Sequence, residues 1–154
     1  MLLIYSIIAF LIIAFDQIIK FYVQGNIALG ETFGKIPYIA DFVFVKNTGA
    51  AFSMFSGNII ILSVISVLFC IGVIIYCIIK RPQHPLLCTS LTLLFSGAAG
   101  NAIDRIINGY VVDYINLSFV KFPVFNIADI AITIGAVFMV IYIIFYDKDR
   151  KKDE

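Results

Sequence analysis

The stretch IIILSVISVLFCIGVIIYCII, residues Ile59–Ile79, decides the fold class of this chain. It has no charged residue, and it is as long as the roughly 20 residues that a helix needs to cross the hydrocarbon core of a bilayer. Three more apolar stretches are long enough to span: Leu2–Val23, Leu86–Asp104 and Ile127–Tyr146. The sequence therefore predicts an all-α membrane protein with four transmembrane helices in a single domain, residues 1–154.

The composition supports the same class. The chain is 62% hydrophobic and 14% charged, with a mean hydropathy of +1.03, whereas a soluble domain is about 45–50% apolar and roughly 25% charged. The net charge is only +1, and no basic stripe with interleaved aromatic residues is present. Binding to nucleic acid is therefore not expected.

The basic residues predict how the chain is oriented. Lys80 and Arg81 lie between the second and third spans, and four more basic residues follow the fourth span: Lys148, Arg150, Lys151 and Lys152. Because short cytoplasmic loops are enriched in Lys and Arg, both termini are expected in the cytoplasm. The first span lacks the basic n-region and the cleavage site of a signal peptide, so it is expected to be retained.

The long segment between the first and second spans, residues 24–58, is expected outside the cytoplasm. Tyr38–Val45 is rich in β-branched and aromatic residues, as strands are, and Asn47-Thr48-Gly49 is typical of a turn. The apolar stretch Ala50–Phe55 is too short to span. We therefore expect a small extracytoplasmic β-sheet and a short interfacial helix here. Such a sheet can also bind an extended peptide by strand addition.

Polar groups occur at one depth of the predicted spans. In the orientation above, the outer end of the first span carries Asp16 and Lys20, and the third span ends at Asp104 and Arg105. Ionisable residues within membrane spans are costly and usually functional. Structural explanations exist for some of them, because Asp16 and Lys20 are spaced i, i+4 and can neutralise each other. The small residues around Gly97 favour close packing of helices.

Asp113 and Asp129 are harder to explain structurally, because neither has a basic residue near it in sequence. Asp129 alone fits a helix N-terminus, where carboxylates are stabilised. If Asp113 lies beside Asp129, the two carboxylates share one proton. One can then accept a proton from water while the other donates to a carbonyl oxygen, which is the chemistry of aspartic peptidases. The only histidine, His84, lies in the cytoplasmic loop, so neither a zinc site nor a His-dependent nucleophile is expected, and no metal or cofactor is predicted.

Two other functions remain open at this point. A small proton-coupled transporter or channel subunit also uses intramembrane acids, but it needs them throughout the depth of the membrane. A structural subunit would present polar groups to a partner at several depths. The acids of this chain gather at the outer end alone, which favours the peptidase.

Five motifs in order resemble those of bacterial lipoprotein signal peptidase, also called signal peptidase II. They are Asp16-x-x-x-Lys20, Asn47-Thr48-Gly49-Ala50-Ala51-Phe52, Gly97-Ala98-Ala99-Gly100-Asn101-x-x-Asp104-Arg105, Val111-Val112-Asp113-Tyr114 and Phe125-Asn126-Ile127-Ala128-Asp129-x-Ala131. The resemblance extends over nearly the whole chain, including its length and its four spans.

The resemblance implies an intramembrane aspartic endopeptidase of the bacterial cytoplasmic membrane. Such an enzyme removes the signal peptide from prolipoproteins by cleaving before a cysteine that carries diacylglycerol, with its active site near the outer leaflet. It implies that Asp113 and Asp129 are the catalytic pair. It implies substrate-binding or supporting roles for a further set: Asn47, Gly97, Asn101, Asp104, Arg105, Asn126 and Asp16. Membrane lipid is an expected partner, and cyclic peptide antibiotics such as globomycin are expected inhibitors.

Overall fold

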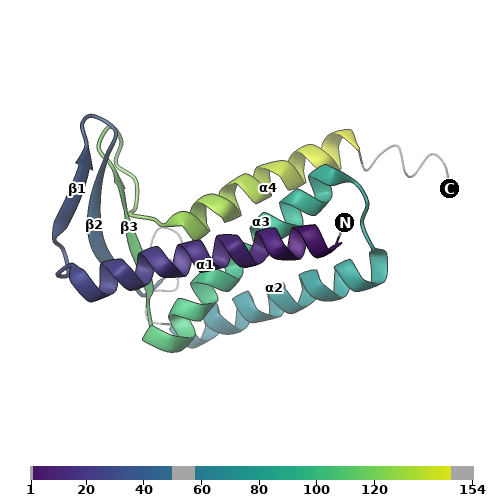
Figure 1. Ribbon diagram of the computed structural model, residues 1–154, viewed down its shortest axis with the longest axis horizontal. Coiled ribbons are helices and arrows are strands. Elements are labelled where there is room, and N and C mark those ends of the chain that lie inside the picture. Colours follow the sequence, from purple (N-terminus) through teal and green to yellow (C-terminus); the bar gives the residue numbers. More distant parts are fainter. Residues whose placement is uncertain (1, 50–57, 147–154) are drawn as a thin grey trace.

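The computed structural model describes residues 2–49 and 58–146. Within these residues the helices are α1 (Leu2–Asn26), α2 (Ile59–Lys80), α3 (Pro85–Asn108) and α4 (Ile127–Phe145), and the strands are β1 (Thr32–Ile36), β2 (Ala40–Asn47) and β3 (Val111–Leu117). The helices run side by side with the sheet at one end (Figure 1). α1 begins and α4 ends at the opposite end of the bundle. The interfacial helix expected around Ala50–Phe55 lies outside the described residues.

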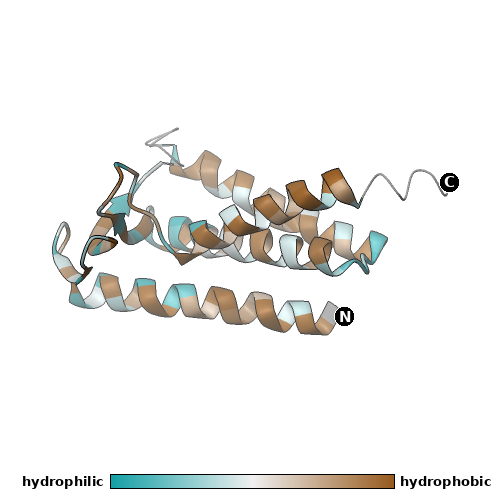
Figure 2. Ribbon diagram, turned by 90° about the horizontal axis from the view of Figure 1, so that it is seen from above, coloured by the Kyte–Doolittle hydropathy of each residue, from teal (hydrophilic) through white to brown (hydrophobic). Residues whose placement is uncertain are grey.

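All four helices are long and apolar enough to cross a membrane. Their outward surfaces carry large apolar side chains, such as Phe21 and Ile60, which are 80% and 79% exposed. Figure 2 shows apolar residues along most of the length of the helices. A soluble monomer rarely exposes so much contiguous apolar surface, so this chain is a multi-pass membrane protein and the predicted fold class is confirmed.

α3 is the central helix, and it packs against α1, α2 and α4. Glycines allow the closest approaches. A Cβ atom at Gly97 would collide with the backbone carbonyl oxygen of Ala128 on α4, and one at Gly135 would lie 2.9 Å from the backbone nitrogen of Leu94. The prediction that small residues here serve close helix packing is therefore confirmed. This close packing brings the outer end of α3 next to the first turn of α4.

Two helices continue further than the apolar pattern predicted. α1 ends at Asn26 rather than Val23, and α3 ends at Asn108 rather than Asp104. The added residues include the polar Gln24 and Asn26 in α1 and Arg105 and Asn108 in α3, which break the apolar pattern, so hydropathy alone does not detect these turns. α3 stops because Gly109 adopts a positive φ of 76° and donates its N–H to the carbonyl of Arg105, the usual way that glycine ends a helix.

The sheet is antiparallel, with strand order β1-β2-β3. Two of its strands lie where the sheet was expected, but β3 comes from the segment between α3 and α4 and was not predicted. In its register with β2, Val45 is opposite Asp113 and Asn47 is opposite Val111. Alternate residues of β3 enter a core that also contains residues of α1 and β2: Val23, Phe44, Val112 and Tyr114. This core fixes the sheet on the helices.

Candidate active site

Asp113 is held on β3 by two side-chain amides. Its Oδ1 accepts a hydrogen bond from Nδ2 of Asn126 (2.7 Å), and its Oδ2 accepts one from Nδ2 of Asn47 (2.8 Å). The side chain is only 1% exposed. Asn47 is the last residue of β2, so the pairing of β2 with β3 carries it to this carboxylate.

Asp129 lies in the first turn of α4. Its Oδ1 accepts from Nδ2 of Asn101 (2.8 Å), and its Oδ2 accepts from the backbone N–H of Asn126 (3.2 Å). The side chain of Asn126 in turn accepts the backbone N–H of Asp129, which completes a capping box. The helix-capping explanation of Asp129 is therefore confirmed, and the same geometry leaves its Oδ1 bonded to Asn101.

Asn126 links the two carboxylates directly. Its side-chain Nδ2 donates to Asp113, and its backbone N–H donates to Asp129. The structure thus brings the two aspartates to one residue, as the sequence-based hypothesis required. Burial, and after it the neighbouring charge of Asp129, raises the pKa of Asp113 to about 7, against the opposing effect of the amides of Asn47 and Asn126. At neutral pH this carboxyl can therefore hold or release a proton.

A buried ion cluster lies behind this pair. The Nζ of Lys20 is 2.8 Å from Oδ2 of Asp16, 3.0 Å from Oδ2 of Asp104 and 2.9 Å from Oδ1 of Asn101. Lys20, Asp16 and Asp104 are each at most 2% exposed. A buried charge is tolerated only when it is paired and hydrogen-bonded, and here the predicted pairing of Asp16 with Lys20 is confirmed and joined by a second acid.

The two acids of this cluster also tie the elements together. Asp16 accepts the backbone N–H of Ala128 at the start of α4 (3.0 Å), and Asp104 accepts the backbone N–H of Val112 on β3 (3.0 Å). Gln17 donates to both carboxylates and to the carbonyl of Gly100. α1 and α3 are thus bonded to the two segments that carry Asp129 and Asp113.

Arg105 extends from the last turn of α3 toward the chain after β2. Its Nη2 donates to the carbonyl of Gly49 (3.1 Å), and its Nη1 is 3.5 Å from the carbonyl of Asn101. Its Nε is buried and has no hydrogen-bond partner among the described residues. Gly97 contributes close packing of α3 on α4 rather than a polar contact. Every site residue predicted from the sequence lies in the described part of the chain.

Lys20 and Gln17 were not predicted as site residues. The i, i+4 spacing related Lys20 to Asp16, but its contacts with Asn101 and Asp104 join residues about eighty positions apart. A single sequence carries no local signal for such contacts. No group of three or more His, Cys, Asp or Glu within residues 2–49 and 58–146 is arranged to hold a metal ion.

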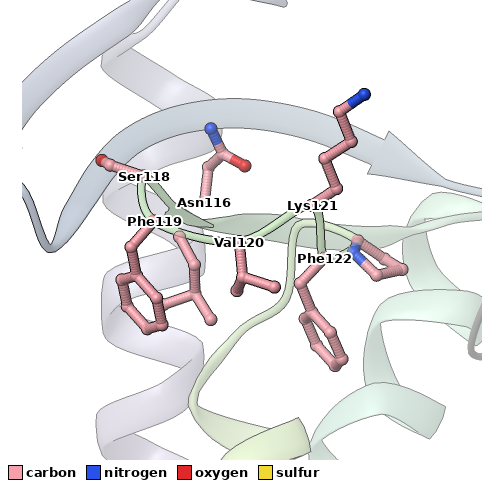
Figure 3. Close-up of a pocket in the computed structure, with 8 residues that line it drawn as sticks. Asn116, Ser118, Phe119, Val120, Lys121 and Phe122 are labelled. Atoms are coloured by element: carbon pink, nitrogen blue, oxygen red, sulfur yellow. The ribbon is translucent and has the colours of Figure 1, made fainter.

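An open pocket occurs elsewhere, at the end of β3 and in the loop that follows it. It is lined by residues Asn116–Pro123, none of which belongs to the acid pair or its supports. In Figure 3 the side chains of Phe119, Val120 and Phe122 point to one side of this loop, and that of Lys121 points to the other. The pocket carries no carboxylate, so it contributes no acid–base chemistry.

This chain is similar to known proteins along most of its length. The family model described as Signal peptidase (SPase) II matches residues 8–145. Lipoprotein signal peptidase of Lactobacillus johnsonii is 39% identical over 92% of both chains. That of Enterococcus faecalis is 38% identical over 99% of this chain and 94% of the relative, and that of Staphylococcus aureus is 37% identical over 96% and 91%.

A solved structure of a bacterial membrane enzyme superposes with a TM-score of 0.87 at 31% identity, covering 97% of this chain and 91% of that one. A second such structure gives 0.82 at 32% identity, covering 93% of each chain. Sequence and fold thus agree along almost the whole length, and this chain belongs to the signal peptidase II family, which makes it an aspartic peptidase.

Proposed function

We propose that this enzyme removes signal peptides from diacylglyceryl-modified prolipoproteins, cleaving before the lipid-modified cysteine with a water molecule activated by Asp113 and Asp129. The observation that carries the proposal is the attachment of both buried carboxylates to Asn126. Relatives from three genera are named lipoprotein signal peptidases, which supports the choice of substrate.

The chemistry needs one ionised and one protonated carboxyl. Asp113, whose pKa is raised to about 7, is the natural holder of the shared proton. The ionised Asp129 removes a proton from water as the water oxygen attacks the scissile carbonyl carbon. Asp113 donates its proton to the carbonyl oxygen, which gives a tetrahedral gem-diol. The C–N bond then breaks as Asp129 passes the proton that it took from water to the leaving nitrogen, and Asp113 takes back a proton as the new carboxyl group forms. The amides of Asn47, Asn101 and Asn126 keep the carboxylates oriented throughout.

We also propose that the enzyme lies in the bacterial cytoplasmic membrane with both termini in the cytoplasm. The basic residues around Lys80 and after α4 support this orientation. The sheet and the first turn of α4, which carry Asp113 and Asp129, lie at the other end of the bundle from the start of α1 (Figure 1), so they would face the outer leaflet. That is the depth at which a signal-peptide helix ends and a diacylglyceryl group is anchored.

The test is a gel-shift cleavage assay in detergent or lipid with a purified prolipoprotein. Two substrates are compared, one with the diacylglyceryl-modified cysteine and one whose cysteine is left unmodified, and the product is mapped by mass spectrometry. We expect cleavage of the modified substrate alone, with the lipid-bearing cysteine as the new N-terminus. Inhibition by globomycin is expected as well.

Two results would contradict the proposal. Equal cleavage of both substrates would show that the enzyme does not recognise the lipid group. No cleavage under conditions in which an established lipoprotein signal peptidase works would revive the transporter hypothesis. Asp113→Asn and Asp129→Asn proteins are run beside the wild type, so that activity from a contaminating peptidase is recognised.

A further inference from the structure

Lys20 has a bonding pattern that the catalytic steps do not use. An ammonium has three N–H donors and no acceptor, and all three are engaged, by Asp16, Asp104 and Asn101. The side chain is 2% exposed, so water does not compete for these donors. Whatever atom of Asn101 lies 2.9 Å from this nitrogen must therefore be an acceptor.

This requirement fixes which way the amide of Asn101 points. Its oxygen must face Lys20, so its Nδ2 must face the other way, toward Oδ1 of Asp129 at 2.8 Å. The amide of Asn126 is fixed in the same manner, because its oxygen faces the backbone N–H of Asp129. Each amide thus presents a donor to a carboxylate because a group that can only donate occupies its oxygen.

We propose that Lys20 is a positioning residue that holds the amide of Asn101 in the one orientation that presents an N–H donor to Asp129. The inference rests on the proposed function, since it concerns the ionised member of the acid pair. Without the ammonium, the oxygen of Asn101 keeps only one side-chain donor, Nδ2 of Asn126 at 3.1 Å, so the amide is freer to rotate and present its oxygen to Asp129. A carboxylate has no proton to offer that oxygen, so the rotated amide bonds Asp129 only in its protonated, unreactive form.

The ionisable groups around Asn101 and Asp129 come from α1, α3 and β3. Among the described residues they are Asp16, Lys20, Asp104, Arg105, Asp113 and Tyr114. Removing Lys20 alone would also remove one positive charge from this group. That loss by itself makes the neighbouring carboxylates easier to protonate. The test therefore has to separate the charge of Lys20 from its hydrogen bond to Asn101.

The double variant Asp16→Asn/Lys20→Met makes this separation. It removes one negative and one positive charge, so the net charge of the cluster is unchanged, while the Lys20 donor to Asn101 is lost and the Asn126 donor remains. We expect the acidic limb of the pH–rate profile to move up by about one pH unit or more. The rate at neutral pH should fall by roughly 10-fold to 100-fold. Gln17→Met is the matched control, because Gln17 contacts the same acids but not Asn101; it should leave the acidic limb in place.

A double-mutant cycle decides whether the effect passes through Asn101. In an Asn101→Ala background the Asp16→Asn/Lys20→Met change should move the acidic limb no further. If that protein does not fold, Lys20→Arg and Lys20→Gln give the same comparison. Arg keeps a cationic donor to Asn101, so the acidic limb should stay at its wild-type pH. Gln can present either its amide oxygen or its amide nitrogen to Asn101, so the acidic limb should move up.

An unmoved acidic limb in a folded variant that lacks the Lys20 donor would overturn the proposal. A shift of equal size with and without Asn101 would also overturn it, because Lys20 would then act through charge alone. Failure of the proposed function looks different: Asp113→Asn or Asp129→Asn would stay active whatever Lys20 does. A loss of melting temperature with an unchanged pH profile would assign Lys20 to folding only.

Discussion

Asn47, the last residue of β2, donates its side-chain Nδ2 to Oδ2 of Asp113 on β3 over 2.8 Å. This bond favours the ionised form of Asp113 and opposes the burial that raises its pKa to about 7. The pairing of two strands therefore helps to set the proton affinity of a proposed catalytic acid.

Asn47→Ala should move the alkaline limb of the pH–rate profile upward. The variant removes a donor to the carboxylate of Asp113, and a hydrogen bond to a charged group is worth about one to two pKa units. The measurement is kcat/KM for a lipid-modified substrate between pH 5 and about 9. An alkaline limb that stays at the wild-type pH would show that the amide of Asn47 does not act on the proton that limits the rate.

The wild-type protein should lose stability as the pH rises through neutrality. The pKa of Asp113 is about 7 in the folded state and near 4 in the unfolded state, so the folded state holds the extra proton between these values. The stabilising contribution of the protonated Asp113 is fully present below about pH 4 and is lost as the pH rises through 7. Asp113→Asn removes this contribution.

Melting temperatures of the two proteins in one detergent test this sign. The melting temperature of Asp113→Asn relative to wild type should increase from pH 5 to about pH 7 and level off above it. An amide at position 113 also loses a hydrogen bond, but that loss is the same at every pH. The change of the difference with pH therefore reports only the ionisation of Asp113. A constant difference across the range would mean that Asp113 does not titrate there.

Gly97→Ala should separate α3 from α4. The new methyl group would meet the backbone carbonyl of Ala128 and, at 3.1 Å, the backbone nitrogen of Ile132, neither of which can move alone. Overpacking of this kind costs about 1–3 kcal/mol, and it would displace Asn101 from Asp129, which can cost roughly 100-fold in rate. Activity and thermal unfolding are both measured.

Gly72→Ala is the control for that substitution. Gly72 is in α2, and nothing lies within 4 Å of where its Cβ would be. Alanine should be tolerated or slightly stabilising there, because it favours helix by about 0.5–1 kcal/mol over glycine. Equal effects of the two substitutions would contradict the close-contact explanation.

Arg105→Lys should reduce activity although it keeps the positive charge. The guanidinium reaches the carbonyl of Gly49 with Nη2, and a lysine ammonium has a different reach and no planar fork. We expect kcat/KM to fall by roughly 10-fold to 100-fold, with Arg105→Gln falling further. If Arg105→Lys keeps full activity and Arg105→Gln does not, then Arg105 contributes only its charge.

Sequence patterns predicted the parts of this protein that depend on local composition. The four helices follow from long apolar runs, and β2 follows from the β-branched and aromatic residues of Tyr38–Val45. The family motifs and the isolation of Asp113 and Asp129 from basic residues pointed to one acid pair. Both carboxylates now prove to be bonded to Asn126.

The features that were missed depend on contacts between distant segments. β3 has a strand-like composition in Val111-Val112 and Tyr114-Ile115, but Asp113 interrupts the apolar pattern between them. Its partner strand is about seventy residues earlier in the chain. The contact of Lys20 with Asn101 depends in the same way on the packing of α1 against α3.

The most direct test of the central claim is the cleavage rate of purified Asp113→Asn and Asp129→Asn on a diacylglyceryl-modified prolipoprotein. Asp41→Asn is the control, because Asp41 lies on the same sheet but pairs with Lys35 near the surface. Melting temperatures confirm that each protein is folded. We expect both dyad variants to lose activity by a factor of at least about 1,000, the scale on which essential groups act, while Asp41→Asn stays near wild type. A folded Asp113→Asn or Asp129→Asn protein with near-wild-type activity would contradict the acid-pair mechanism.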